Sequence, residues 1–211
     1  MKDTVNSVVE LIKNAKRIAI MPSKIAGEDA FCAGVGLYNM LKDQDKRASF
    51  VYTGKIPEGC EDLINENEVT SDVFERELMV SIDYSDTPAA RVHYSTENDI
   101  LYLNVKPIDK NFDLDRVTSA IKGFEFDVII TLGAQDLEDF GQTYSELELE
   151  FTRANIINID NTEKNSRYGL EDVLDASVDT LSLLVLQKAS QWDLTVTKKA
   201  GKALLTGISN S

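Results

Sequence analysis

The stretch RIAIMPSKIAGEDAFCAGVGLYNMLKDQDKRASFVY, residues 17–52, decides the fold of this chain. It opens with a short apolar segment, Arg17 to Met21, which predicts a β-strand that ends at Pro22. Asp29 to Leu41 then predicts a helix whose small residues let it lie close against a sheet, and Ala48 to Tyr52 predicts a second strand. A strand, a helix and a strand of these lengths form a βαβ unit, which implies parallel strands and a right-handed crossover.

The same alternation of strands and helices continues on both sides of this unit. Phe126 to Leu132 is a nearly continuous apolar run, as expected of a parallel strand that is buried on both faces. Ala154 to Ile159 predicts another strand of this kind. Helices are predicted from the spacing of apolar residues in the first fifteen residues and in Glu58–Ile64, Leu114–Ile121, Val178–Gln187 and Thr197–Ile208.

The middle of the chain has a different pattern. Leu78–Asp83, Arg91–Tyr94 and Ile100–Val105 are rich in β-formers, and Ser95–Asp99 is a polar turn. The expected fold class is therefore α/β, with a mostly parallel central sheet flanked by helices and an inserted antiparallel β-meander around residues 77–106. We expect one domain that spans residues 1–211. The single histidine, His93, lies in the meander, and we interpret it as an ordinary strand residue.

Composition excludes several classes of protein. The 211 residues carry a formal net charge of -14, which argues against general nucleic-acid binding because contact with a polyanion uses clustered Lys and Arg. No apolar run approaches the roughly 20 residues that span a bilayer, and the N-terminus lacks the apolar core of a signal peptide, so we expect a cytoplasmic protein without membrane contact. Cys32 and Cys60 form no CxxC pair and no recognisable ligand cluster, and we interpret them as reduced structural thiols.

Four stretches carry a resemblance to a known family: Ser23–Ala30, Asp127–Gly133, Asp160–Asn165 and Leu204–Ser211. On these stretches the chain resembles the N-terminal catalytic domain of the DHH phosphoesterase superfamily, which includes oligoribonucleases, RecJ-type nucleases, exopolyphosphatases and cyclic dinucleotide phosphodiesterases. The resemblance covers nearly the whole chain outside the meander. It implies a DHH-domain fold and, for the family, hydrolysis of phosphoesters with two divalent ions, usually manganese.

The ligand positions of this family are mostly replaced. The family has His-x-Asn-Pro-Asp-x-Asp-Ala, an aspartate after the second motif strand, Asp-His-His, and an aspartate after Leu-Leu-x-Gly-Ile. The matching positions here hold Ser23, Gly27, Asp29, Gly133, Asp160, Asn161, Thr162 and Ser211. Only Asp29 and Asp160 keep a ligand, since glycine has no side chain and serine, threonine and asparagine bind such ions weakly. Close carboxylates repel one another when no metal is present, so this pattern is typical of a scaffold that no longer binds ions.

We therefore expect no catalytic residue and no cofactor, with Mn²⁺ or Mg²⁺ only if Asp29 and Asp160 retain a site. A competing interpretation gathers Glu28, Asp29, Asp136 and Asp160 at the carboxyl ends of the strands around one Mg²⁺. In the simpler alternative, Glu28 and Asp29 favour the dipole of a helix N-terminus and Asp160 begins a turn. The small residues of Leu132–Asp136 leave open a loop whose backbone N–H groups bind an anion.

The expected function is a catalytically inactive phosphoesterase-like protein that acts as a nucleotide- or protein-binding module. One alternative is an active phosphoesterase on short oligonucleotides or cyclic dinucleotides. The other is a structural scaffold that forms homodimers through the meander. Family members generally carry a C-terminal substrate-binding (DHHA1-type) domain with a Gly-Gly-rich loop, and we expect this domain to be absent from the chain, which has no Gly-Gly pair.

Overall fold

A computed structural model describes residues 2–71, 77–83, 85, 89–107, 113–122 and 125–210 of the chain. These residues divide into two units, residues 1–75 with 124–211 and residues 76–123. The first unit contains the expected βαβ alternation, and the second is the antiparallel insertion. No helix in the described part of the chain is long and apolar enough to cross a membrane.

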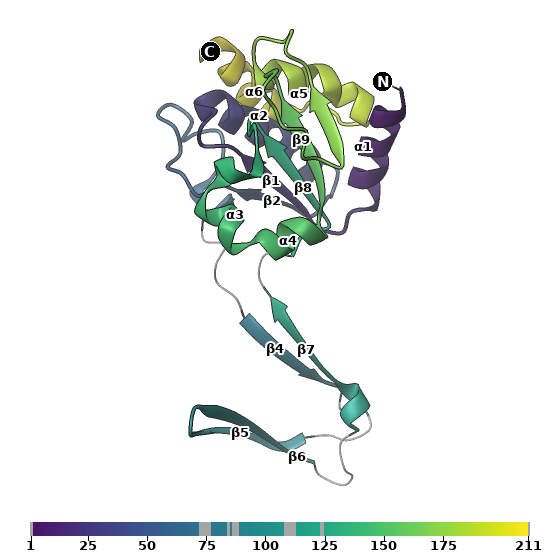
Figure 1. Cartoon of the computed structure of the whole chain (residues 1–211), viewed down its shortest axis with the longest axis vertical. Helices are drawn as coiled ribbons and strands as arrows, with labels where there is room; N and C mark the ends of the chain where they lie inside the picture. Colours follow the sequence, from purple (N-terminus) through teal and green to yellow (C-terminus); the bar gives the residue numbers. More distant parts are fainter. Residues whose placement is uncertain are drawn as a thin grey trace. The chain divides into compact units, whose positions relative to one another are not determined.

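The first unit is built on a six-stranded sheet in which every pair of neighbouring strands is parallel (Figure 1). Its strands are β1 (Ile18–Pro22), β2 (Ala48–Val51), β3 (Val69–Thr70), β8 (Val128–Leu132), β9 (Asn155–Asp160) and β10 (Glu171–Leu174). They lie in the order β10-β9-β8-β1-β2-β3. From the central strand β1, one half of the sheet continues through β2 to β3, and the other half continues through β8 and β9 to β10. The expected fold class, a mostly parallel sheet flanked by helices, is confirmed.

Helices cover both faces of this sheet. One face packs against α1 (Lys2–Asn14), α2 (Gly27–Lys42), α5 (Leu181–Ala189) and α6 (Lys198–Asn210). The other packs against the 3₁₀-helix η3 (Leu137–Phe140) and the short helices α3 (Gln142–Glu146) and α4 (Glu148–Arg153). Alternate residues of β1 divide between the two cores, with Ile18 and Ile20 on the first face and Ala19 and Met21 on the second. This division explains why β1 is apolar throughout its length.

The small residues of α2 allow this helix to pack closely against the sheet, as predicted from the sequence. A Cβ atom on Gly34 would lie 3.1 Å from the Phe50 ring and 3.3 Å from Pro22, so the helix approaches the sheet as closely as a glycine allows. On another side of α2, a Cβ on Gly36 would lie 2.5 Å from Leu204 of α6. The small residues therefore bring α2 close to the sheet and to a neighbouring helix.

One predicted helix of the first unit is wrong. Residues 58–64 form successive turns instead of a helix, with the N–H of Cys60 bonded to Pro57 O and the N–H of Leu63 bonded to Cys60 O. Cys60 and Ile64 are both buried in the core beside α2. Their spacing suggested a helix, but each residue separately packs into the core and holds the loop against it.

The second unit contains two antiparallel strand pairs. The inner pair, β5 (Ala89–Glu97) and β6 (Ile100–Pro107), is a hairpin whose turn residues, Asn98 and Asp99, have φ values of 48° and 61°. Positive φ at both positions is the signature of a type I′ turn, for which asparagine and aspartate are suited. His93 is exposed on β5, as an ordinary strand residue would be.

The other pair corrects two predictions. β4 (Glu77–Ile82) pairs with β7 (Val117–Lys122), so the antiparallel insertion extends beyond residue 106 and its strands do not pair consecutively as in a meander. Residues 114–121 form the 3₁₀-helix η2 (Leu114–Arg116) followed by β7, and the helix predicted there is wrong. Short apolar runs fit both periodicities, and here the cross-strand partner decides in favour of a strand.

Candidate functional site

The candidate site lies where the two halves of the parallel sheet meet, at the carboxyl ends of β1, β8 and β9. The N–H of Ser23 donates to Leu132 O at 2.8 Å, and the N–H of Gly133 donates to Ile159 O at 2.9 Å. Doubly wound sheets bind ligands at this position, because the loops after adjacent strands leave in opposite directions there. The structure thus brings Ser23, Gly133 and Asp160 to neighbouring strand ends.

Gly133 has no room for a side chain. Its φ is +69°, and a Cβ atom there would lie 2.6 Å from the Cβ of Ala26 and 2.7 Å from Cδ1 of Leu181. The Cβ of Ala30 would be 3.3 Å away. The loop before α2, the helix α2 itself and the first residue of α5 therefore fill the space into which an aspartate at this position would project.

Asp29 caps a helix that is distant in the sequence. One carboxylate oxygen accepts the N–H of Leu181 at 2.5 Å, and the other accepts the N–H of Ser182 at 2.9 Å. Ser182 also donates its hydroxyl to Asp29 O at 3.3 Å. The first N–H groups of a helix have no partner within the helix, so the carboxylate satisfies two donors at the start of α5. Both of its oxygens are thereby engaged in structure.

The two remaining positions of the first motif offer little to a metal. Ser23 is fully buried, and its hydroxyl oxygen accepts the N–H of Ile25 at 3.2 Å. Gly27 begins α2 with a φ of +69°, and a Cβ atom there would meet nothing within 4 Å. Ser211, the position of the fourth motif, lies outside the described residues.

Asp160 is buried at the end of β9, where neutral donors surround it. Its carboxylate accepts hydrogen bonds from Asn165 Nδ2 at 2.8 Å, from the N–H of Asn161 at 2.8 Å and from Thr162 Oγ1 at 3.3 Å. The Asn161 side chain turns the other way and donates to Val178 O and Asp179 O, both at 3.1 Å. Asn161 and Thr162, at the positions where the resemblance expects histidines, thus hold the loop after β9 in place.

Asn165 connects this carboxylate to a buried network that the sequence did not predict. Asn158 Nδ2 donates to Asn165 Oδ1 at 2.7 Å and to Asp172 Oδ1 at 2.8 Å, and Asn165 Nδ2 also donates to Ala134 O at 2.9 Å. An asparagine in the middle of the apolar run Ile156–Ile159 was the available signal. Buried amides and carboxylates that satisfy one another are the usual condition for polar groups in a core.

Tyr168 closes the network on the β8 side. Its hydroxyl donates to Ala134 O at 3.2 Å and lies 2.8 Å from Thr131 Oγ1. Burial raises the pKa of Tyr168 well above its ordinary value, so the phenol is neutral and can donate. The network thus ties β8, β9, β10 and the loop after β8 together.

Two N–H groups of the loop after β8 are already bonded to a carboxylate of the chain. Asp139 Oδ2 accepts the N–H of Gln135 at 2.8 Å and the N–H of Asp136 at 3.3 Å. The pKa of Asp136 is lowered mainly by a hydrogen bond with Glu138 and, to a smaller extent, by one with Ser166. The hydrogen bond between Asp136 and Glu138 also raises the pKa of Glu138. The carboxylate of Asp139 occupies the place that a phosphate would take.

The four carboxylates of the proposed Mg²⁺ site do not form a cluster. Within the described residues, no three of Glu28, Asp29, Asp136 and Asp160 offer oxygens within 4.8 Å of one another. Glu28 instead accepts Asn210 Nδ2 at 2.6 Å and lies beside the thiol of Cys60. Each carboxylate has a local partner of its own.

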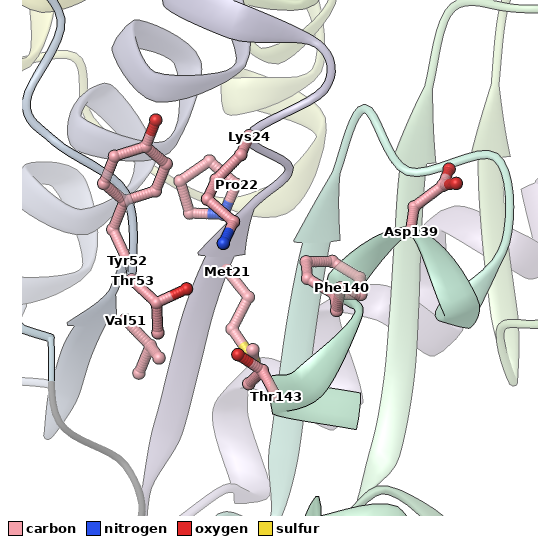
Figure 2. A pocket seen from close by; sticks show the side chains of 9 residues that line it. All are labelled: Met21, Pro22, Lys24, Val51, Tyr52, Thr53, Asp139, Phe140 and Thr143. Carbon is pink, nitrogen blue, oxygen red and sulfur yellow. The ribbon is translucent and has the colours of Figure 1, made fainter. Parts of the chain in front are cut away.

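Little open space remains near these strand ends. Figure 2 shows a hollow between the ends of β1 and β2 on one side and η3 and α3 on the other. Lys24, Tyr52, Asp139 and Phe140 are among its lining residues, and its volume is about 10 Å³. A cavity of about 10–15 Å³ holds one water molecule, whereas ligand pockets have volumes of about 300–1,000 Å³.

A larger hollow lies beside the edge strand β3. It has a volume of about 670 Å³, and Lys55, Glu61, Glu66 and Val69 are among the residues that line it. Two carboxylates against one ammonium group make this surface unfavourable for a phosphate.

Comparisons with known proteins agree with the fold. No family model and no curated protein matches the chain. Among solved structures, it is similar to the crystal structure of an exopolyphosphatase-related protein from Bacteroides fragilis, with a TM-score of 0.65 and 15% sequence identity. The match covers 100% of this chain and 50% of that chain. This chain thus spans half the length of an exopolyphosphatase-related protein and shares its fold over that half.

Proposed function

We propose that this chain is a DHH phosphoesterase-like domain that does not hydrolyse phosphoesters and acts as a protein-binding module. Its similarity to an exopolyphosphatase-related protein supports the phosphoesterase part of this proposal. The observation that carries the loss of hydrolysis is the packing of Gly133 against Ala26 and Leu181. The family motif has a ligand aspartate at this position, and in this chain Ala26 and Leu181 fill the space that its side chain would need.

The two retained aspartates support the same conclusion. Metal-assisted hydrolysis of a phosphoester needs several carboxylates or imidazoles that converge on the ions. Asp29 would leave two N–H groups of α5 without acceptors if it turned toward a metal, and Asp160 already accepts three neutral donors. Each aspartate therefore has a structural role that accounts for its presence.

A protein partner fits this domain better than a nucleotide. The hollow of about 10 Å³ at the strand ends is far below the volume of about 300 Å³ that small-ligand pockets begin to reach. Asp139 fills the anion position of the loop after β8, and Glu28 and Asp29 lie in the first turn of α2, where they oppose a phosphate. Binding through a surface avoids all of these obstacles.

A second candidate function, a scaffold that forms homodimers, is favoured by the β5–β6 hairpin. Opposite residues of an antiparallel pair point to the same face. The pairs Val92–Val105, Tyr94–Leu103 and Thr96–Leu101 thus form one largely apolar face, which we call the apolar hairpin face. Tyr94 is 75% exposed and Val92 is 65% exposed. An isolated two-stranded hairpin is marginally stable in water, so a partner that covers this face would stabilise it.

A hydrolysis assay tests the proposed loss of activity. The purified chain is incubated with Mn²⁺ or Mg²⁺ and with bis(p-nitrophenyl) phosphate, a diadenylate dinucleotide or long-chain polyphosphate. We expect no product above the level of metal and substrate alone, and no difference between the natural chain and Asp160→Asn. Metal-dependent turnover that Asp160→Asn abolishes would show an active phosphoesterase and overturn the proposal.

A further inference from the structure

Two thiols and a carboxylate meet beside the first turns of α2. Glu28 and Cys32 are four residues apart on this helix, which places them on one side of it. Cys60 comes from the connection between β2 and β3. The Sγ atoms of Cys32 and Cys60 are 3.6 Å apart, and Cys60 Sγ lies 3.7 Å from Glu28 Oε1. Each residue offers one ligand atom, and these three atoms all lie within 4.8 Å of one another.

These separations match the edges of a tetrahedral zinc site. With Zn–S bonds of about 2.3 Å and a Zn–O bond of about 2.0 Å, tetrahedral angles place two sulfurs about 3.8 Å apart and a sulfur and an oxygen about 3.5 Å apart. The observed 3.6 Å and 3.7 Å differ from these values by about 0.2 Å. Two of the three edges thus already have nearly the lengths of a zinc site, and the third, between Cys32 Sγ and the Glu28 carboxylate, is within 4.8 Å.

The surroundings hold the three groups in this position. Asn210, the last residue of α6, donates Nδ2 to Glu28 Oε1 at 2.6 Å and so orients the carboxylate. The backbone of Cys60 is fixed by hydrogen bonds to Pro57 O and from the N–H of Leu63. Groups that orient the ligands of a metal are a regular part of protein metal sites. Both thiols are buried and Glu28 is half-buried, which leaves the carboxylate side accessible for a water as fourth ligand.

The local charge also favours a cation. Burial is the main cause that raises the pKa of each thiol, and the charged groups that act on Cys32 and Cys60 are acidic: Glu28, Asp29 and Glu61. Without a metal, both thiols are neutral and form a hydrogen-bonded pair. A divalent cation that displaces the two thiol protons into solvent would be surrounded by two thiolates and one carboxylate, which carry three negative charges against its two positive charges.

We propose that Glu28, Cys32 and Cys60 form a binding site for one Zn²⁺ ion, which links the first turns of α2 to the β2–β3 connection. Thiolate ligands favour zinc over manganese and magnesium, which prefer oxygen ligands. The site contains none of the eight phosphoesterase positions and does not depend on the proposed function. The ion would stabilise the fold, because it would join a helix to a loop that contains no helix between Cys60 and Ile64.

Cobalt substitution tests this site directly. The reduced, metal-free chain is titrated with Co²⁺ and then with Zn²⁺, and absorption bands of tetrahedral cobalt with thiolate ligands are recorded. We expect one Co²⁺ per chain, a thiolate-to-cobalt charge-transfer band, full displacement by one equivalent of Zn²⁺ and a higher thermal unfolding temperature with Zn²⁺. A chain that binds no Co²⁺, or binds it with the spectrum of an octahedral oxygen site, would overturn the proposal.

Variants assign the ligands and separate loss of the site from loss of the fold. Cys60→Ser and Glu28→Gln are expected to weaken Zn²⁺ binding, measured by competition with a chromogenic chelator, and Asn210→Ala to weaken it by about 10–100-fold through the orienting contact. Asp62→Asn, an exposed carboxylate of the same loop outside the cluster, is the control and is expected to keep the affinity. Circular dichroism of each metal-free variant checks folding. If Cys60→Ser does not fold, Glu28→Gln carries the test, and unchanged affinity in it would contradict the assignment.

Discussion

The carboxylate of Asp29 accepts the backbone N–H of Leu181 at 2.5 Å, so a residue in the first turn of α2 caps the first turn of α5. The two residues are 152 positions apart in the sequence. This contact gives a structural reason for an aspartate at position 29 that involves no metal. It also predicts how substitutions at this position behave.

Replacing Asp29 by alanine is expected to destabilise the fold without any metal present. Asp29→Ala leaves two helix N–H groups without acceptors, which costs about 1–3 kcal/mol of unfolding free energy. Asp29→Asn keeps a side-chain oxygen and should lose less. Urea unfolding of the three chains in the presence of a chelator measures this order. Equal stability of Asp29→Ala and the natural chain would contradict the capping role.

A matched pair of glycines separates packing from backbone strain. Gly133 and Gly27 share a φ of +69°, but a Cβ atom has room only at Gly27. Alanine at either position costs about 1–2 kcal/mol for the left-handed conformation, and overpacking adds about 1–3 kcal/mol at Gly133. We therefore expect Gly133→Ala to unfold at lower denaturant than Gly27→Ala. Equal losses would mean that space is available at Gly133 and would weaken the argument against a ligand there.

The buried polar network predicts a large effect at Asn165. Asn165→Ala removes donors to Ala134 O and to the buried carboxylate of Asp160, and we expect a loss of about 2–4 kcal/mol. The matched control is Asn155→Ala at the exposed start of β9, for which we expect a change within about 0.5 kcal/mol. Thermal and urea unfolding of both variants provide the measurement. A loss at Asn165 no larger than at Asn155 would show that the network contributes nothing to stability.

The apolar hairpin face predicts self-association. If it mediates a homodimer, Leu103→Lys should lower the dimer fraction, while Asn104→Lys, on the opposite face of the same strand, should leave it unchanged. Both substitutions add one positive charge to neighbouring exposed positions, so net charge is controlled. Analytical ultracentrifugation over a range of concentrations reports the fraction. A natural chain that stays monomeric, or two variants that behave alike, would exclude this face as the dimer interface.

The sequence predicted most of the first unit because parallel strands buried on both faces leave an unambiguous apolar signal. The runs at β1, β8 and β9 each gave a strand within a residue or two of its bounds. The order of the strands places Ser23, Gly133 and Asp160, which the resemblance assigned to one site, at neighbouring strand ends. The apolar pattern of the sequence is therefore enough to predict which residues follow the buried parallel strands.

The remaining features depend on contacts between residues that are distant in the sequence. Nothing local indicates that Asp29 reaches α5 or that Cys60 lies 3.6 Å from Cys32. The strand β7 was mistaken for a helix because its apolar residues fit both periodicities until β4 is known to be its partner. A missing ligand at Gly133 can be inferred from the motif, but the filling of its space by Ala26 and Leu181 requires the structure.

The central claim is that the residues at the proposed phosphoesterase metal positions are engaged in packing and hydrogen bonds and bind no metal. Manganese binding tests this claim most directly. The chain, with Cys60→Ser to remove the proposed zinc site, is titrated with Mn²⁺ at physiological salt, and free Mn²⁺ is measured by electron paramagnetic resonance. We predict no binding at micromolar Mn²⁺ and no change in the unfolding temperature. Two Mn²⁺ ions bound per chain at micromolar concentration, and released by Asp160→Asn, would contradict the account.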